Sequence, residues 1–212
     1  AIEDNLYDRL SSRYTKALAR SMSNAKQVKA AAPLNNGLPT ADGFDSGDGV
    51  SLFNTAHTTV SGTNVKNTLT TQADLNETSL EQALIDIAAF TDERGLRVAA
   101  KGVKMIIPSA NQFSAERLLK SQGRTGTADN DINAVASMGM VPQGYRVNNF
   151  LTDSDSWYII TDCPNGMKMF TRAPLTTAME GDFDTGNVRY KARERYSFGV
   201  SDYRGIFGCE GA

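Results

Sequence analysis

The sequence predicts an α+β protein, and three patterns in its 212 residues support that fold class. A helical repeat of apolar residues fills the first 30 positions, a stretch rich in Gly, Asp, Ser, Thr and Asn covers 36–74, and a regular alternation occupies 188–198. Between them, strand-like segments feed helix-like segments, as in an α/β layer. We therefore expect a long helix, a loop-rich region, an α/β middle part and a terminal strand.

The first helix is expected from Ile2 to about Ala32. Apolar residues recur there at spacings of three and four, and acidic residues near the start precede basic residues near the end, as the helix dipole favours. Pro33 and then Asn35-Asn36-Gly37 are expected to end it. A helix of roughly 30 residues is about 45 Å long, so it must lie along something extended. A plain surface helix or coiled-coil arm is the alternative.

The middle of the chain is expected to combine loops, helices and one buried strand. Residues 36–74 are interpreted as an extended loop with short strands. A capping-box spacing at 78–81 predicts a helix that Gly95 ends, 103–107 predicts a buried strand, and Ser109 with Gln112 is expected to cap a further helix that ends before Gly123. The polar segment 123–131 is expected to be a mobile loop.

The last third reads as strands. They are expected at 145–150, 157–161 and 167–172, and Asn165-Gly166 predicts that the second and third form a hairpin. From Val188 to Phe198, apolar residues alternate with basic ones, which predicts a strand with one basic face.

Composition excludes several classes of function. The chain has 22 Lys and Arg against 24 Asp and Glu, a net charge of -2, which argues against a histone-like or polybasic protein. The sequence has neither an apolar run long enough to cross a bilayer nor a signal peptide, so we expect no membrane association and no secretion. Cys163 and Cys209 are expected to be reduced thiols. The chain begins without Met inside the expected helix, so we expect processing or a missing N-terminal region.

No assembled active site is evident. The single histidine, His57, lacks a nucleophile motif around it and is interpreted as a structural or surface residue, and phosphate-binding and zinc-protease motifs are absent. No acidic cluster completes a calcium-binding loop, so we interpret the clusters as turn carboxylates, and the methionines as apolar filler. The acidic clusters lie at Asp42, Asp45 and Asp48; Asp129 and Asp131; Asp153 and Asp155; and Asp182 and Asp184. We assign no catalytic residue, cofactor or metal.

The basic face of the terminal strand is the most regular charged feature. Four like charges on one strand face suit either nucleic acid or acidic groups on adjoining strands or subunits, and we favour salt bridges. The residues are Arg189, Lys191, Arg193 and Arg195.

The order of segments resembles the major capsid protein of tailed bacteriophages, in the branch similar to the Mu-type head subunit. The matching stretches are 30–37, the "DG, LF, H" loop at 48–57, 73–78, 90–95, Ile106-Ile107-Pro108 and, most specifically, 192–208, which reads ARERYSFGVSDYRGIFG. The resemblance covers essentially the whole chain.

This resemblance implies the Hong Kong 97 phage fold. Residues 1–72 would form the first part of a peripheral domain with a spine helix, 73–181 the axial domain, and 182–212 the returning peripheral strand. The family has an N-terminal arm and an extended loop ahead of the spine helix, and this sequence starts at that helix. A Lys to Asn cross-link, made by some members, therefore cannot be assigned.

The implied function is structural and not enzymatic. Copies would form pentamers and hexamers of an icosahedral shell, with a portal protein, cement or scaffolding proteins, and double-stranded DNA enclosed without sequence-specific binding. The implied location is the virion, assembled in the bacterial host cytoplasm. The candidates for contact between subunits are Arg189, Lys191, Arg193, Glu194, Arg195, Tyr203 and Arg204.

Two alternatives remain open at this point. An encapsulin-type nanocompartment shares the fold but encloses a cargo enzyme instead of a genome. An acid-rich calcium-dependent adhesin or hydrolase would use the aspartate clusters, and calcium would then shift its melting temperature.

Overall fold

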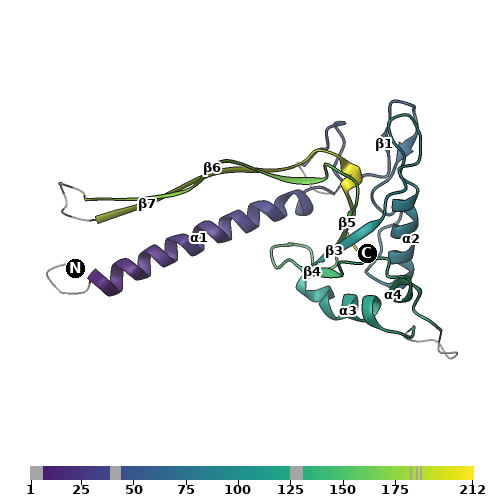
Figure 1. Ribbon diagram of the computed structural model, residues 1–212, viewed down its shortest axis with the longest axis horizontal. Helices are drawn as coiled ribbons and strands as arrows, with labels where there is room; N and C mark the ends of the chain where they lie inside the picture. Colours follow the sequence, from purple (N-terminus) through teal and green to yellow (C-terminus); the bar gives the residue numbers. More distant parts are fainter. Residues whose placement is uncertain (1–6, 39–43, 125–130, 182, 185, 187) are drawn as a thin grey trace. The chain divides into compact units, whose positions relative to one another are not determined.

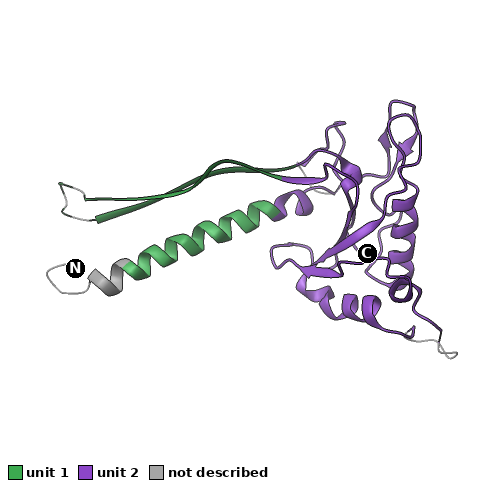
Figure 2. Cartoon of the chain, viewed as in Figure 1, with its two compact units in different colours: residues 1–30, 169–199 green, residues 31–168, 200–212 purple. Residues whose placement is uncertain are grey.

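The structure is a computed structural model that describes residues 7–38, 44–124, 131–181, 183–184, 186 and 188–212, with the side chains of 7–11 left aside. The chain forms two compact units (Figure 2). Unit 1 comprises 1–30 and 169–199, and unit 2 comprises 31–168 and 200–212. The mobile loop expected at 123–131 falls largely on 125–130, outside the described residues.

Unit 1 is a helix beside a two-stranded ribbon (Figure 1). Helix α1 spans Tyr7–Asn35, and strands β6 (Met167–Gly181) and β7 (Val188–Val200) pair with each other. The Lys26 ammonium of α1 donates a hydrogen bond to Glu194 of β7 and lies 5.2 Å from the ring centroid of Tyr196. The long helix and the terminal strand were both predicted, and the strand lies along the helix.

The end of α1 differs from the prediction by three residues. Pro33 lies inside the last turn, and the helix continues to Asn35, where the Asn36 amide still donates to the Ala32 carbonyl at 2.9 Å. Proline lacks an amide donor and its ring crowds the preceding turn, and the helix ends two residues after Pro33, at Asn35.

The predicted hairpin between 157–161 and 167–172 is wrong. Strand β5 (Trp157–Thr161) pairs with β3 (Gly102–Ile107) and β8 (Ile206–Cys209), whereas β6 pairs only with β7. The Asn-Gly turn is present, because Asn165 has φ of 66°. It redirects the chain out of the sheet, and β6 is far longer than the segment 167–172 that the pattern marked.

A mixed four-stranded sheet forms the centre of unit 2, in the order β4-β3-β5-β8. Strand β3 runs parallel to β4 (Tyr145–Val147), and both other pairings are antiparallel. Helix α3 (Gln112–Lys120) and the short α4 (Ala134–Ser137) lie in the connection between β3 and β4. This is the crossover that a strand feeding a helix predicts, although β4 is shorter than expected.

The caps of the helices differ from the predicted ones. Helix α2 (Glu77–Ala88) is capped by Asn76, which exchanges hydrogen bonds with Ser79, so the box lies two residues before the one expected at Thr78. The helix ends at Ala88, and Gly95 (φ 83°) serves a later turn. Ser109 lies in a 3₁₀ turn, η1 (Ser109–Asn111), and α3 follows without a side-chain cap.

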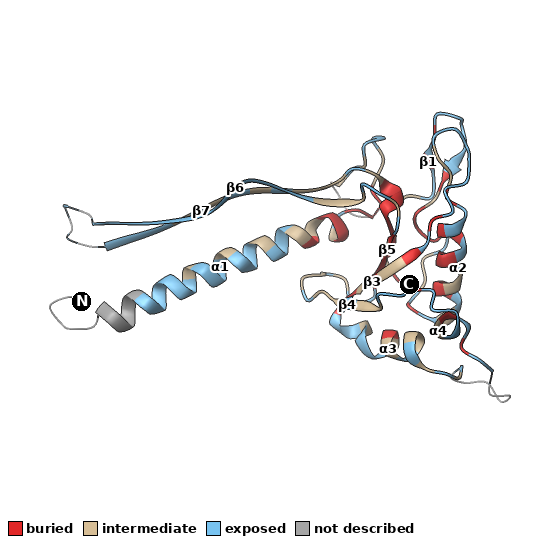
Figure 3. Ribbon diagram, viewed as in Figure 1, coloured by how far each residue is buried: buried red, intermediate tan, exposed pale blue. Residues whose placement is uncertain are grey.

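The hydrophobic core lies wholly in unit 2 (Figure 3). Its largest fully buried side chains include Trp157, Tyr158, Phe53, Phe90 and Phe207, which come from the sheet, from the turn after α2 and from the loop region. Within the described part of unit 1, no side chain is buried. Unit 1 therefore has no core of its own.

The loop region 44–76 wraps around this core and contains two very short strands. Strands β1 (His57–Thr58) and β2 (Asn64–Val65) pair with His57 opposite Val65. Leu52 and Phe53, the compact apolar pair of this segment, are fully buried. The loop with short strands is confirmed, and it is anchored at its centre by apolar packing.

The C-terminal segment returns to unit 2 through a backbone crossing. A β carbon added to Gly205, in the 3₁₀ turn η2 (Tyr203–Gly205), would lie 2.2 Å from the α carbon of Gly166. The Ser201 amide also donates to the Gly166 carbonyl at 3.3 Å. Only glycine fits both positions, and β8, which the sequence did not reveal, follows directly.

Candidate functional site

The basic strand face has the geometry that its alternation predicted. Along β7, the basic side chains at every second position are exposed, whereas Ala192, Glu194, Tyr196 and Phe198 are partly covered. The contacts of Glu194 and Tyr196 with Lys26 show that the covered set faces α1. The opposite face of the ribbon therefore carries the exposed residues Arg189, Lys191, Arg193 and Arg195.

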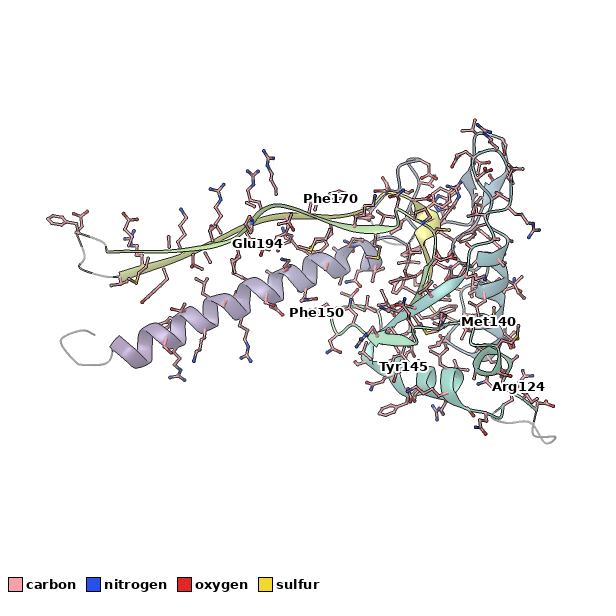
Figure 4. All side chains as sticks on the ribbon, in the orientation of Figure 1. Arg124, Met140, Tyr145, Phe150, Phe170 and Glu194 are labelled. Carbon is pink, nitrogen blue, oxygen red and sulfur yellow. The ribbon has the colours of Figure 1, made fainter. Side chains whose placement is uncertain are left out.

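Glu194 has a partner within the same chain. Its side chain is 9% exposed and forms an ion pair with Lys26, whose ammonium also approaches Tyr196 (Figure 4). Because it is paired with Lys26 inside unit 1, Glu194 fixes the ribbon against α1. The four basic residues lie on the exposed face of the ribbon.

Tyr203 and Arg204 lie apart from that face, in unit 2, and both are 8% exposed. The Arg204 guanidinium donates from Nε to the Thr91 carbonyl at 2.7 Å and from Nη2 to Glu93 at 2.7 Å, and Nη1 lies 3.3 Å from Asp202. It also lies 4.5 Å from the ring centroid of Tyr203. These contacts join the C-terminal segment to the turn after α2.

His57 is completely buried against Tyr203. The two rings stack with centroids 3.9 Å apart and planes 5° from parallel. On the ring edge, Nδ1 lies 2.6 Å from the Asp48 carboxylate and Nε2 lies 3.1 Å from Oδ1 of Asn67. Of the two alternatives that the sequence left open, a structural or a surface histidine, the buried ring fits the structural one. We name the group of Asp48, His57, Asn67, Tyr203 and Arg204 the histidine cluster.

Asn67 is the central connection of the histidine cluster. Its Nδ2 donates to the carbonyls of Leu52 at 2.8 Å and Tyr203 at 3.2 Å, so Oδ1 is the acceptor and receives the Asn54 amide at 2.9 Å. Nε2 of His57 must therefore donate to Oδ1, and a carboxylate faces Nδ1. The His57 ring thus links the Asp48 carboxylate to Asn67.

The partners of Asp48 and Glu93 lower the pKa values of these two carboxylates. Burial alone would raise the pKa of Asp48, but the hydrogen bond and charge of His57, with the Val50 amide, outweigh it and leave the pKa below its ordinary value. The hydrogen bond from Arg204 lowers the pKa of Glu93. Burial raises the pKa of Tyr203 to about 12, so its phenol stays neutral.

Sequence reasoning missed Asn67, Glu93 and the pairing of Asp48 with His57. Asn67 is a lone asparagine in a polar loop, and nothing in its neighbours marks it as buried. One signal was available, because the "DG, LF, H" loop at 48–57 holds both partners of the ion pair.

Other concave or acidic regions offer no assembled chemistry. A depression of about 710 Å³ between α3 and β4 is lined by Glu116, Lys120 and Tyr145, and its ion pair spans 2.7 Å between Lys120 and Glu116. Across the described residues, no three His, Cys, Asp or Glu side chains gather to hold a metal ion. Asp42, Asp129 and Asp182 lie outside those residues. Cys163 and Cys209 are free thiols, as expected.

Within the described ranges, no helix combines the length and the apolar character that crossing a membrane requires.

Comparison with known proteins connects these features to one family. The family model described as phage capsid protein matches residues 1–208. The capsid of Myoviridae phage XM1 is 15% identical with a TM-score of 0.55, over 100% of this chain and 70% of that one. The capsid of an empty GTA particle is 16% identical with a TM-score of 0.56, over 98% and 68%. No curated protein matches the sequence.

A structure from Mycobacterium phage Che8 is 16% identical with a TM-score of 0.49, over 92% of this chain and 61% of that one. The chain thus spans between about three fifths and seven tenths of the length of these three structures. At such identities the likeness to the XM1 and GTA capsids concerns the fold, which they share with this chain across nearly all of its length.

Proposed function

The chain belongs to the phage capsid protein family and has the Hong Kong 97-like fold of a tailed-phage major capsid protein, and from this premise we propose that the complete protein closes an icosahedral shell around a double-stranded DNA genome. It is a structural protein of the virion capsid. We infer no catalytic activity for it.

One observation carries this proposal: unit 1 has no buried side chain among its described residues. A lone two-stranded ribbon and a lone helix are each marginal in water. Strands of 15 and 13 residues beside a 29-residue helix are therefore expected to gain stability from surfaces outside the chain. Neighbouring copies in a closed shell supply such surfaces repeatedly.

The ribbon's basic face is the proposed contact with neighbouring subunits. Arg189, Lys191, Arg193 and Arg195 are exposed on one side, and acidic groups of an adjoining copy suit them. We propose an indirect role for Glu194, Tyr203 and Arg204, because their contacts within the chain stabilise the unit to which each belongs.

The remaining assignments follow from the family. We propose pentamers and hexamers as the assembly units, with a portal protein, cement or scaffolding proteins as partners, and assembly in the bacterial host cytoplasm. Residues 73–181 are proposed as the axial domain, with 1–72 and 182–212 as the peripheral domain. The two compact units of the structure divide the chain at other positions, after residues 30, 168 and 199.

Electron microscopy of the complete protein purified under native conditions tests the shell. We expect hollow or DNA-filled polyhedral particles. Particles that contain a cargo protein instead of nucleic acid would favour the encapsulin-type alternative. A complete chain that remains a small monomer under all assembly conditions would overturn the proposal.

A double variant tests the contact face. Arg193→Ala with Arg195→Ala should lower the yield and the melting temperature of the shells, whereas Arg94→Ala with Arg97→Ala removes two exposed arginines from a unit 2 loop and serves as the matched control. Shells of unchanged stability in the first variant would remove the ribbon from the contact.

A further inference from the structure

The charge of the chain is divided unevenly between its two units. Unit 1 has eleven Lys and Arg and seven Asp and Glu, a net charge of +4, whereas unit 2 has eleven and seventeen, a net charge of -6. The near-neutral total of -2 therefore hides a positively charged unit. The basic residues of unit 1 lie on two faces. One is the basic face of the ribbon, and the other is on α1.

The second face lies on α1, turned away from the ribbon. Leu18, Met22 and Lys26 are the partly covered residues of the exposed stretch 12–29, spaced by four, and Lys26 contacts β7. At 3.6 residues per turn, Arg13, Lys16 and Arg20 fall on the opposite side of the helix. All three are exposed, and nitrogen-tipped side chains extend from that side of α1 (Figure 4).

No acidic residue interrupts this row. Residues 12–30 contain five basic residues and no Asp or Glu. The positions that continue the row along the helix are Asn24 and Gln27, both exposed. Arg and Lys, with Asn and Gln as hydrogen-bond donors, are the side chains that contact phosphate and sugar oxygens of nucleic acids. We name Arg13, Lys16, Arg20, Asn24 and Gln27 the helix row.

The dimensions suit a phosphate backbone. Arg13 and Arg20 are separated by about 10.5 Å along the helix axis, about the length of three base-pair rises of about 3.4 Å along the axis of a DNA duplex. The charge of the row favours a polyanion as the occupant, because the row has three basic residues and no acidic residue lies within 12–30.

We propose that the helix row is a sequence-independent binding face for the phosphate backbone of double-stranded DNA. This inference rests on the proposed function, which places a genome inside the shell. Three charges per copy give weak binding at a single site, and many copies on one shell hold the DNA by repetition. Weak contacts also leave the genome free to be released.

The test measures binding of purified full-length protein to a random-sequence DNA duplex by fluorescence anisotropy over a series of salt concentrations. The variant is Arg13→Gln, Lys16→Gln, Arg20→Gln, because Gln preserves helix propensity. The matched control is Arg189→Gln, Lys191→Gln, Arg193→Gln, which removes the same residue types from the ribbon face.

We expect the helix variant to bind at least about tenfold more weakly at low salt, and the slope of log K against log salt to fall by about 2.7, or 0.9 for each lost phosphate contact. The ribbon variant should keep most of the affinity at low salt and most of the slope of log K against log salt. Equal losses in the two variants would show only general charge attraction and would overturn the inference, as would an unchanged helix variant.

Shell assembly of the same variants separates the two proposals. A helix variant that fails to assemble yet binds DNA normally assigns the row to an acidic neighbouring subunit, and the inference is then wrong. A wild-type protein that never forms shells removes the proposed function, whereas the anisotropy result still reports on the helix row by itself.

Discussion

The ring of His57 lies face to face on the ring of Tyr203, 3.9 Å between centroids and 5° from parallel. One ring belongs to the loop region and the other to the C-terminal segment, so the stack joins the two sequence segments of unit 2. Arg204 extends this junction to the turn after α2 through Thr91 and Glu93. The histidine cluster is thus the point where three segments are fastened together.

Removing the imidazole should destabilise unit 2. His57→Ala removes one hydrogen-bond partner each from the Asp48 carboxylate and from Oδ1 of Asn67 and opens a cavity beside Tyr203, so we expect a loss of about 3 kcal/mol in the free energy of unfolding. Urea unfolding of the variant measures this. Asp45→Asn, an exposed aspartate in the same loop, is the control and should change little; similar stability in both variants would contradict the role of the cluster.

Replacing the Arg204 guanidinium by a lysine ammonium should lower the stability of the protein. Arg204→Lys retains the charge but cannot donate to Thr91, Glu93 and Asp202 together. We expect a loss of about 2 kcal/mol, seen as a lower melting temperature in calorimetry. Arg94→Lys, at an exposed position, provides the comparison, and equal melting temperatures would show that charge alone matters.

Acid should lower the stability of unit 2 through the carboxylates of Asp48 and Glu93. Folding lowers the pKa of both Asp48 and Glu93 below their ordinary values of 3.8 and 4.5. The stability they contribute is therefore present above those values and is lost as the pH falls through the lower folded pKa values.

Urea unfolding at about pH 6 and about pH 3 measures this effect. The free energy of unfolding of the wild type should fall more steeply than that of Asp48→Asn with Glu93→Gln, which has no such protons to take up. Parallel curves would exclude these two groups as the source.

Any side chain introduced where the backbones of Gly166 and Gly205 cross should destabilise the protein. In Gly205→Ala the new methyl group would lie 2.2 Å from a backbone carbon, so the chain must shift, and we expect a loss of about 3 kcal/mol or failure to fold. Gly199→Ala, whose β carbon would meet nothing within 4 Å, is the control. Soluble yield and thermal unfolding measure the difference. A stable Gly205→Ala variant would show that the backbone at the crossing shifts at little cost in free energy.

Much of this fold follows from short-range patterns. The spacing of apolar residues in α1 and the alternation in β7 were sufficient because each element's exposure follows its own period. Strand pairing was not readable in the same way. Asn165-Gly166 makes the turn it predicts, but the partner of β5 is chosen by core packing against β8, whose four residues show no alternation because all are buried.

The candidate site divides in the same manner. The ribbon face was visible because charge alternates with period two. The histidine cluster was not, because Asn67 and Glu93 take part through contacts made across the fold, and an isolated polar residue in a loop carries no mark of being buried. Capping was also ambiguous, since Asn76 and Thr78 both lie at the start of α2 and only the backbone geometry selects Asn76.

The meeting of Gly166 and Ser201 has a consequence for how this family member can vary. The ribbon leaves unit 2 at residue 168 and rejoins it at residue 200, and a backbone hydrogen bond of 3.3 Å closes the chain just beside both points. The ribbon is therefore an insertion with adjacent ends. Adding or removing two residues from each strand would alter its reach by about 6.6 Å while keeping every side chain on its own face. The length of the ribbon can thus change without a change in the core of unit 2. Subunits with ribbons of different length would suit shells with different subunit spacing.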